Sequence, residues 1–444
     1  MKDRNILLLG FTERTTYSVA RVLGKNNTIL ISDKVCDEGK LSLLSKLKNS
    51  GIEAINLLGD QSTSILDNYR VDIVIVSPGV PLDIPVVVEA KRRKIPVIGD
   101  IELFYSFFPE NFYIGITGTD GKTTTTTLIY EILKNEKKAF LAGNVGIPIF
   151  SIFESVLPES YLVLELSSFQ LEAIEKFRPN VAVFLNLAED HLDRYNSMTE
   201  YLEAKRRIFI NQKDSDFAIV NLDSPYFGEI TRGLMSHLLT FSIKNEKADI
   251  YFKNDFIFLE GKPFIKRDEI FIKGIHNVEN SMAAILAARI VGVSDESIKK
   301  TLRSFKGVEH RIEFVRNING VEFYNDSKST TVNSLEKALM SFENPVILIA
   351  GGRDKGLDFT RLKDLVREKL KLLILIGEAR EKIQRELDFE PFVYSASLEE
   401  AVKIAYKNSL PGDVVLLSPG CASFDMFKNY EERGKLFKEC VNLL

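Results

Sequence analysis

The amino-acid sequence predicts an α/β protein built from three domains. Short apolar runs of β-type residues alternate with helix-compatible segments along most of the chain, which is the rhythm of parallel sheets. At 444 residues the chain is also too long for a single hydrophobic core. Breaks in the alternation near residues 100 and 310 divide the chain into predicted domains 1–100, 101–309 and 310–444.

The first predicted domain carries four apolar β-type runs with helix-compatible segments between them. We expect strands at residues 6–9, 28–32, 73–77 and 96–98, and helices at residues 15–23 and 41–50. Because strands that are joined through helices pair in parallel, these elements predict one parallel sheet.

The second and third domains repeat this rhythm with one interruption. In the second, we expect strands at residues 112–117, 162–166 and 181–186, and a helix whose apolar residues Leu128, Ile129, Ile132 and Leu133 share one face. A more polar, β-rich region at 216–273 then precedes a helix of small residues at 281–291. The third domain begins near the turn at 306–307, with strands at 346–350, 372–376 and 414–418.

Composition excludes several classes of protein. The net charge of −4 marks neither a general nucleic-acid binder nor a binder of anionic membranes. The three cysteines, Cys36, Cys421 and Cys440, lack metal-type spacing and cannot form a disulfide framework. The N-terminal apolar run is too short for a signal peptide, and no stretch approaches the length of a membrane span. The cysteines fit a reduced compartment, so we expect a cytoplasmic protein without nucleic-acid or membrane partners. We also expect a monomer.

The sharpest chemical signal is the segment 115–124, Gly-Ile-Thr-Gly-Thr-Asp-Gly-Lys-Thr-Thr. A strand runs into a glycine-rich turn and then into a helix, so backbone N–H groups and the helix N-terminus can bind phosphate. Lys122 can reach the outer phosphates of a nucleotide, and Thr123 can ligate Mg²⁺. The strict phosphate-loop pattern fails because Ile116 stands at its first glycine position. The alternative is a glycine turn with a solvated lysine.

Polar residues also follow the next two strands. Glu165 ends the apolar run 162–166, where a buried carboxylate is costly unless it is paired or metal-bound. Asn186 ends the following run and precedes the segment 189–193, Glu-Asp-His-Leu-Asp. Carboxylate, imidazole and hydroxyl groups at adjacent strand ends predict an Mg²⁺ site beside ATP, with His191 as a ligand. For His191 alone, a structural or capping role is the alternative.

Three polar loops are predicted in the third domain, at residues 323–331, 351–356 and 418–425. Each could be an ordinary turn after a strand. Three such loops at the strand ends of one domain indicate a shared polar pocket that faces the nucleotide site of the neighbouring domain.

Taken together, the motifs resemble the Mur ligase family of peptidoglycan synthesis. The resemblance rests on the segments 117–124, 143–146, 164–171, 189–195, 204–205, 274–280, 309–311, 325–328 and 418–430, which occur in order along nearly the whole chain. Within the family, Ser-Ser-Phe-Gln at 167–170 and Asp-Ser-Lys at 326–328 resemble the members that add D-glutamate. The Asp-Asn-Pro-Arg motif expected of members that add diaminopimelate or lysine is missing from the sequence.

This resemblance implies a fold and a reaction. The first domain would be Rossmann-like and bind the UDP-substrate, and the central domain would be P-loop ATPase-like. The C-terminal domain would be Rossmann-like, bind the incoming amino acid and close on ATP. ATP would phosphorylate the carboxylate of UDP-N-acetylmuramoyl-L-alanine, and D-glutamate would displace phosphate from the acyl phosphate.

Site residues follow from the same resemblance. The catalytic residues would be Lys122, Glu165, His191, Lys205 and Lys328. ATP would contact Gly118, Thr119, Asp120, Gly121, Lys122, Thr123, Thr124, Asn277, Asn280, Arg311 and Asp326. The metal ligands, for two Mg²⁺ ions, would be Thr123, Glu165, His191 and Lys205. D-Glutamate would contact Lys328, Thr330, Lys355, Ser423 and Tyr430.

For the UDP-substrate, we expect contacts from Thr12, Asp33, Lys34, Ser77, Gly79, Asn144 and Ser167. The first turn, residues 10–16, is less rich in glycine than is usual in the family, and Lys34 follows Asp33 where Asp-Thr-Arg is common. The turn also lacks the GxGxxG pattern, so NAD binding is not expected. Thr331 stands where the family commonly has asparagine.

Lys205 is predicted to act as a carbamate. A free ammonium there would compete with Mg²⁺ for Glu165 and His191, whereas reaction of the neutral amine with CO₂ would give an oxygen ligand. Burial among cations would depress the amine pKa and favour the neutral form that reacts. The family resemblance points to the same lysine, and the alternative is a solvated helical lysine.

Two other functions fit part of the sequence. Folylpolyglutamate synthase shares the phosphate loop and the carbamate, but a nucleotide-sugar domain of about a hundred residues before that loop is not expected of it. A nucleotide-binding regulatory protein without chemistry is the second alternative. A degenerate copy would have lost Lys122, Glu165, His191 or Lys205, and this sequence keeps all four.

Overall fold

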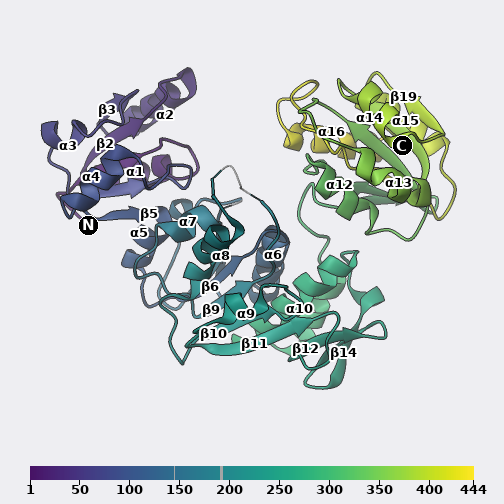
Figure 1. Ribbon diagram of the computed structural model, residues 1–444, viewed down its shortest axis with the longest axis horizontal. Coiled ribbons are helices and arrows are strands. Elements are labelled where there is room, and N and C mark those ends of the chain that lie inside the picture. The colour runs from purple at the N-terminus through teal and green to yellow at the C-terminus, as the bar shows by residue number, and fades with distance from the viewer. Residues whose placement is uncertain (145, 191–193) are drawn as a thin grey trace. The chain divides into compact units, whose positions relative to one another are not determined.

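The structure is a computed structural model that describes residues 1–144, 146–190 and 194–444. Its described strands form three sheets of five, nine and six strands (Figure 1), which confirms the predicted α/β class. Two compact units divide the chain. One comprises Met1–Lys266 and Glu279–Thr301, and the other comprises Arg267–Val278 and Leu302–Leu444. The first and second sheets therefore share a unit, and the predicted limits at residues 100 and 310 stay a prediction.

The first sheet is parallel throughout its described pairs, in the order β3-β2-β1-β4-β5. Its strands are β1 Asn5–Leu9, β2 Thr28–Asp33, β3 Ala54–Leu58, β4 Ile73–Val76 and β5 Val97–Gly99. The accompanying helices are α1 Thr16–Leu23, α2 Glu38–Asn49, α3 Ile65–Asn68 and α4 Pro85–Arg92.

Both faces of this sheet are covered, and this explains its uninterrupted apolar strands. In β1, Ile6 and Leu8 belong to the same buried cluster as Val19 of α1. Leu7 and Leu9 point to the opposite face, in a cluster with Val86 of α4. Successive side chains of a strand alternate between faces, so a sheet that is covered on both sides needs apolar residues at every position.

The middle sheet has the order β14-β13-β12-β11-β10-β9-β6-β8-β7. The strands are β6 Phe112–Thr117, β7 Ala139–Gly143, β8 Tyr161–Glu165, β9 Val181–Phe184, β10 Phe217–Asn221, β11 His237–Ser242, β12 Ile250–Lys253, β13 Phe256–Leu259 and β14 Lys262–Lys266. The helices of this part of the chain are α5 Asp100–Phe107, α6 Lys122–Leu133, α7 Ser168–Glu172, α8 Met198–Arg206, α9 Phe227–Thr231, α10 Ile275–Ile290 and α11 Asp295–Ser304. Pairing is parallel from β7 to β12 and antiparallel in β12–β13–β14.

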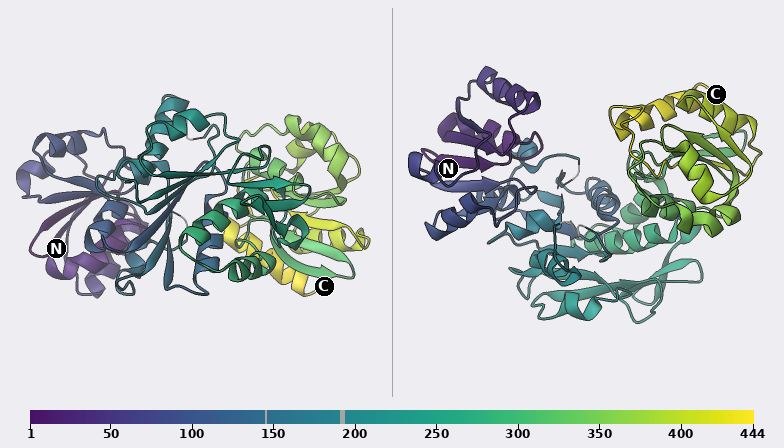
Figure 2. Two further views of the ribbon diagram at one scale, coloured as in Figure 1. Left: turned by 90° about the horizontal axis from the view of Figure 1, so that it is seen from below. Right: turned by 45° about the horizontal axis from the view of Figure 1, so that its top comes forward.

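The third sheet has the order β15-β16-β20-β17-β18-β19, with β15 antiparallel and the others parallel. Its strands are β15 Glu313–Ile318, β16 Val321–Asn325, β17 Val346–Gly351, β18 Leu370–Ile376, β19 Phe392–Tyr394 and β20 Val414–Leu417. Its helices are α12 Val332–Leu339, α13 Lys363–Lys369, α14 Arg380–Leu387, α15 Leu398–Lys407 and α16 Tyr430–Asn442 (Figures 1 and 2). As in the first sheet, neighbours in β17 pack on opposite faces, Leu348 with Leu335 of α12 and Ile347 with Val402 of α15.

The predicted strands are all present, and the β-rich region 216–273 is confirmed as β10 to β14. One prediction was wrong: residues 323–325 are not loop but the end of β16, and only residues 326–331 connect that strand to α12. The polar residues Asn325 and Asp326 disguise the end of this strand in the sequence. Strands β3, β7, β15, β16 and β19 were not predicted, and all of them except β16 lie at the edge of a sheet.

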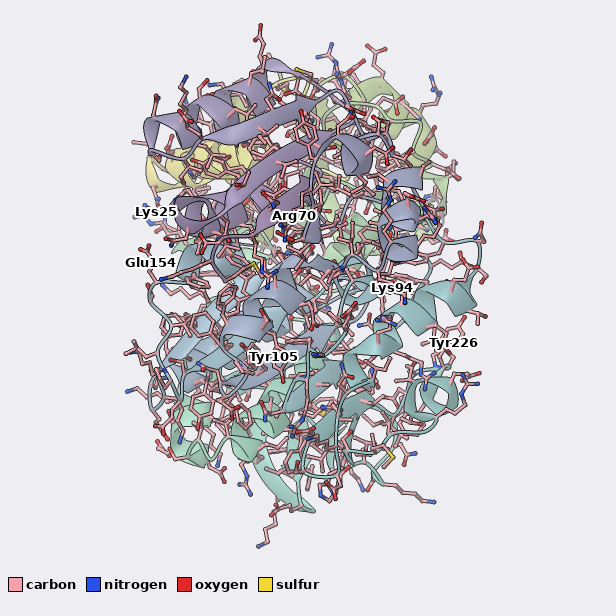
Figure 3. All side chains as sticks on the ribbon, turned by 90° about the vertical axis from the view of Figure 1, so that its left-hand side faces the viewer. Lys25, Arg70, Lys94, Tyr105, Glu154 and Tyr226 are labelled. Atoms are coloured by element: carbon pink, nitrogen blue, oxygen red, sulfur yellow. The ribbon has the colours of Figure 1, made fainter. Side chains whose placement is uncertain are left out.

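Charged side chains of both signs are exposed on the face in Figure 3, where Lys25, Arg70, Lys94 and Glu154 are labelled. Lys25 and Glu154, labelled in Figure 3, line a cavity of about 150 Å³ between the C-terminal end of α1 and the segment around Phe150. Among the helices of the described residues, none has the length and apolar character needed to cross a membrane.

Candidate active site

The segment predicted to bind phosphate lies between the end of β6 at Thr117 and the start of α6 at Lys122, in the strand–turn–helix arrangement that the sequence predicted. We call this segment the phosphate loop. Gly118 and Gly121 have φ values of 147° and 79°, a region that favours glycine. A Cβ atom on Gly121 would lie 2.4 Å from Oδ1 of Asn280 in α10. Asn280 also accepts a hydrogen bond from Thr125 at 3.1 Å, so this predicted ATP residue packs directly against the loop.

Asn186 fixes the shape of the same loop. Its Oδ1 atom accepts from the backbone amides of Thr119 and Asp120 at 3.1 and 2.8 Å. Its Nδ2 atom donates to the carbonyl oxygen of Asp120 at 3.2 Å. Asn186 lies two residues beyond the end of β9, the strand that pairs with β6, and its three hydrogen bonds restrict the backbone of the loop.

Two lysines meet at the backbone of the loop. Lys122 Nζ donates to the carbonyl oxygens of Gly118 and Thr119 at 2.9 and 2.7 Å. Lys205 Nζ, from α8, donates to the same Gly118 oxygen at 2.8 Å. Thr123 and Thr124 follow Lys122 in the first turn of α6, and Thr123 is buried. The structure thus brings Lys205 together with the predicted phosphate-binding residues.

Lys205 is not a solvated lysine. It is 1% exposed, and its Nζ atom lies 4.5 Å from the ring centroid of Tyr201. Burial lowers the pKa of its amine to about 6, and the positive charge of Lys122 acts in the same direction. The negative charges of Asp190, Asp120 and Glu165 oppose this shift. A large fraction of the amine is therefore neutral near pH 7.

Glu165 is buried at the end of β8, which confirms its predicted place on the strand. Its Oε1 atom accepts from Asn144 Nδ2 at 3.1 Å, and its carbonyl oxygen accepts from the amide of Asn144 at 2.8 Å. The chain passes so close at Gly143 that a Cβ atom there would lie 2.2 Å from the Glu165 carbonyl oxygen. Thus Asn144, predicted for the UDP-substrate, sits beside Glu165, predicted for the metal.

The oxygen donors in this region fit Mg²⁺, because Glu165 and Thr123 supply hard ligands beside the phosphate loop. His191, the predicted imidazole ligand, lies outside the described residues. Among those described, no three His, Cys, Asp or Glu side chains gather into a metal-type cluster.

In the first domain, the predicted residues Thr12 and Ser77 are linked through Thr15. The hydroxyl groups of Thr12 and Thr15 are 2.6 Å apart, and those of Thr15 and Ser77 are 2.9 Å apart. The three hydroxyls form a chain at the N-terminal end of α1. Gly79 lies in the turn that the Val80 N–H closes on the Ser77 carbonyl oxygen at 2.9 Å.

Asp33 supports the turns around this hydroxyl chain. Its carboxylate accepts from the amides of Phe11 and Val35 at 2.8 and 2.9 Å, and it pairs with Lys40 at 3.4 Å. Its oxygens are thus engaged by its own domain, while the neighbouring predicted residue Lys34 is exposed. Ser167 caps α7, where its hydroxyl oxygen accepts from the amide of Gln170 at 3.2 Å.

The structure brings the three polar loops of the third domain together. The Gly420 amide donates to the Ser329 carbonyl oxygen at 2.9 Å, and the Arg353 amide donates to the Ala422 carbonyl oxygen at 2.8 Å. These bonds join residues 326–331 and 351–356 to the loop after β20. Ser423 lies on that loop and is buried.

Asp326 is the most perturbed acid of these loops. Ser418 Oγ donates to its Oδ2 at 2.8 Å, and the amide of Ile312 donates to its Oδ1 at 3.2 Å. Burial nevertheless raises the pKa of Asp326 to about 7, against the opposing effects of Ser418 and the charge of Arg311. Near neutral pH this carboxyl is therefore partly protonated.

The remaining predicted residues lie in the same unit as Asp326. Lys328 Nζ lies 5.4 Å from the ring centroid of Tyr430, and Thr330 is half-buried on the same loop. Lys355 follows β17. Asn277 is buried at the start of α10 and donates to the Lys273 carbonyl oxygen.

Arg433 is a residue that the sequence analysis missed. It is 1% exposed, and its guanidinium donates to Ser327 Oγ and to the carbonyl oxygens of Ser327 and Cys421 at 2.7 to 3.2 Å. Burial lowers its pKa to about 10. A single arginine in an amphipathic helix carries no sequence signal of this kind, because its partners are a serine hydroxyl and backbone oxygens on two separate loops, one of them 106 residues away in the chain.

Comparison with protein families gives two matches. Residues 116–288 match the Mur ligase middle domain, and residues 310–421 match the Mur ligase glutamate ligase domain.

Curated relatives extend over the whole chain. A protein of Caldicellulosiruptor bescii named UDP-N-acetylmuramoylalanine–D-glutamate ligase is 42% identical, with 100% of this chain and 98% of the relative covered. A protein of Clostridioides difficile with the same name is 41% identical, with 100% and 99% covered.

Solved structures share the fold at low sequence identity. A UDP-N-acetylmuramate–alanine ligase from Thermotoga maritima has a TM-score of 0.60 and 19% identity over 99% of each chain. A MurF ligase from the same organism, solved with ADP, has a TM-score of 0.61 and 18% identity over 94% of this chain and 95% of its own. The matches to both domains and the full-length relatives at more than 40% identity lead to one conclusion: the chain belongs to the Mur ligase family.

Proposed function

We propose that this protein is an ATP-dependent ligase that joins D-glutamate to UDP-N-acetylmuramoyl-L-alanine during the synthesis of peptidoglycan precursors. The observation that carries this proposal is the 42% identity to a D-glutamate ligase over the entire chain. The described residues of the phosphate loop, with Glu165 and the buried Lys205 beside it, support a working catalytic centre.

The reaction has two steps. The alanine carboxylate attacks the γ-phosphorus of ATP, the bond to the β-phosphate oxygen breaks, and an acyl phosphate and ADP form. The amine of D-glutamate then attacks the acyl carbon, the C–O bond to phosphate breaks, and the amine loses a proton as the amide forms. Phosphoryl transfer of this kind depends chiefly on positioning and on neutralising charge.

The phosphate loop supplies both. Asn186 fixes the amides of Thr119 and Asp120, and the N-terminus of α6 favours anions. Lys122 exchanges its contacts with the Gly118 and Thr119 carbonyl oxygens for contacts with ATP phosphates. Asn280, packed on Gly121, and Asn277 are the proposed contacts to the rest of the nucleotide, with Arg311 and Asp326 from the third domain.

Thr123, Glu165, His191 and carbamylated Lys205 would hold two Mg²⁺ ions, which neutralise phosphate charge and polarise the γ-phosphoryl group. Burial of Glu165 and its hydrogen bond from Asn144 fix the direction in which its carboxylate points. The low pKa of the Lys205 amine favours the neutral nucleophile that reacts with CO₂, with loss of one proton, to give the carbamate.

Substrate contacts complete the proposal. The hydroxyl chain of Thr12, Thr15 and Ser77 would bind the UDP diphosphate, while Asn144 and Ser167 would touch the muramoyl-alanine part. Asp33 would act indirectly, by fixing the backbone of the first turn at Phe11. Lys34 and Gly79 would contact the UDP-substrate beside it. The loops that carry Lys328, Thr330, Lys355, Ser423 and Tyr430 would bind D-glutamate. We place the protein in the cytoplasm, as a monomer, with domain limits at residues 100 and 310.

Phosphate release tests the function directly. With ATP, Mg²⁺ and UDP-N-acetylmuramoyl-L-alanine present, we expect release to require D-glutamate and to be far slower with L-glutamate. Equal turnover with L-glutamate would overturn the assignment, as would turnover only with a folate-type acceptor.

A further inference from the structure

An exposed aromatic ring lies against one of the two lysines proposed for the acceptor amino acid. Phe424 is 58% exposed although its neighbour Ser423 is 2% exposed. The Nζ atom of Lys355 lies 5.8 Å from the centroid of the Phe424 ring. At this distance an ammonium group is attracted by the negative face of the ring.

The backbone fixes this contact. Lys355 follows β17 and Phe424 follows β20, and the two strands are direct neighbours in the third sheet. The Gly351 amide donates to the Pro419 carbonyl oxygen at 2.9 Å, and the Arg353 amide donates to the Ala422 carbonyl oxygen at 2.8 Å. The two loops are therefore held side by side just before the residues in question.

A ring and a carboxylate would hold this lysine in different ways. The neighbouring carboxylate, Asp354, pairs with Lys382 at 3.0 Å. A carboxylate partner on Lys355 would compete with a carboxylate of the substrate for the same ammonium. A ring restricts the flexible lysine side chain yet leaves its charge and its N–H groups for an incoming anion.

The second proposed lysine has the same kind of neighbour, since Lys328 Nζ lies 5.4 Å from the ring centroid of Tyr430. We propose that Phe424 is a positioning residue for the acceptor, whose ring holds the Lys355 ammonium where it meets a carboxylate of the incoming amino acid. This inference rests on the proposed function, because that function supplies the dicarboxylate.

Substitution of Phe424 tests the role of the ring. F424L keeps an apolar side chain but removes the aromatic face, and F424Y keeps the face. We expect F424L to raise the KM for D-glutamate about two- to fivefold, the range of exposed cation–π contacts, with kcat and the KM for ATP unchanged. F424Y should restore the KM for D-glutamate, and L410A, at a residue that is 63% exposed, should leave all constants unchanged.

Two further measurements separate a positioning role from a structural one. In a double-mutant cycle, F424L should add little to the effect of K355M. In NMR spectra of the free protein, the ε-protons of Lys355 should show an upfield ring-current shift that F424L abolishes. Equal KM values for wild type and F424L, or an unchanged Lys355 shift in F424L, would overturn the inference. Lack of any D-glutamate-dependent turnover in the wild type would refute the proposed function, and the ring-current shift would still decide the Phe424–Lys355 contact.

Discussion

The Nζ atom of Lys205 donates to the carbonyl oxygen of Gly118 at 2.8 Å, although 87 residues separate the two in the chain. Lys122 donates to the same oxygen at 2.9 Å. A buried lysine from α8 and the lysine of the phosphate loop thus share one acceptor, and their mutual repulsion contributes to the low pKa of Lys205. Burying such an amine destabilises the fold, so its presence points to function.

Replacement of Lys205 should separate activity from stability. Because its folded pKa of about 6 lies below the ordinary value of 10.5, the unfolded state binds more protons between these limits. Burial of the neutral amine therefore lowers the free energy of unfolding of the wild type more and more as pH falls towards 6, by at most about 1.4 kcal/mol per pH unit. In CO₂-free buffer, where the amine is unmodified, we expect K205M to unfold at higher denaturant concentration than wild type at pH 7. With CO₂ present, K205M should lose most of the ligase activity of the wild type. The exposed Lys91 provides a control, since K91M should change neither property.

Small carboxylic acids should partly restore K205A if Lys205 works as a carbamate. Removal of the lysine side chain in K205A leaves space in which acetate or formate can bind and supply the missing oxygen ligand. The measurement is phosphate release by K205A over a series of acid concentrations, with K122A as the control that no acid rescues. Near wild-type turnover of K205A without added acid would exclude the carbamate.

Asn186 is expected to determine affinity for ATP through the shape of the loop. N186A removes the acceptor of two amides and the donor to Asp120, while leaving Lys122 in place. Each of the three lost hydrogen bonds is worth about 1 kcal/mol, so the KM for ATP should rise at least about tenfold and by at most about 140-fold. The KM for D-glutamate should stay the same. Steady-state kinetics with each substrate varied in turn would show whether the loss is confined to ATP.

Gly121 should tolerate no side chain, because of Asn280. At φ 79°, alanine costs about 1–2 kcal/mol of backbone strain. Its Cβ atom would also lie 2.4 Å from Asn280 Oδ1. Gly292 has φ 80°, and a Cβ atom there would have no contact within 4 Å. G292A therefore has the same backbone strain as G121A without the steric clash. We expect G121A to lose ATP binding, measured by calorimetry, while G292A binds ATP normally. Equal ATP binding by both variants would contradict the packing argument.

Asp326 should make stability depend on pH below neutrality. Its folded pKa of about 7 lies above the ordinary 3.8, so the stability that its protonated form contributes is complete below about 3.8 and is lost as pH rises to about 7. The free energy of unfolding of D326N minus that of wild type should therefore increase from pH 4 to pH 7 and level off above it. Urea unfolding at several pH values measures this difference, and a flat profile would contradict the raised pKa.

The sequence alone predicted the α/β class, the phosphate loop and the family. Continuous apolar runs mark the central strands because both faces of their sheets are buried, as β1 and β17 show. It could not predict the edge strands β3, β7, β15 and β19, which are largely half-buried or exposed and so lack that signal.

Only the tertiary structure decided how single polar residues are used. By itself Lys205 looks like any helical lysine; the family resemblance singled it out, and the structure shows that it is buried and bonded to the Gly118 carbonyl oxygen. Arg433 looks like any helical arginine until it binds two loops of the third domain. The carboxylate of Asp33 is suited to contact a ligand, yet its oxygens accept hydrogen bonds from the backbone amides of Phe11 and Val35. Local spacing records which residues share a face of a strand or helix. Burial and hydrogen bonding instead depend on residues that are distant in the chain, and these two properties set the pKa values and orientations on which the chemistry relies.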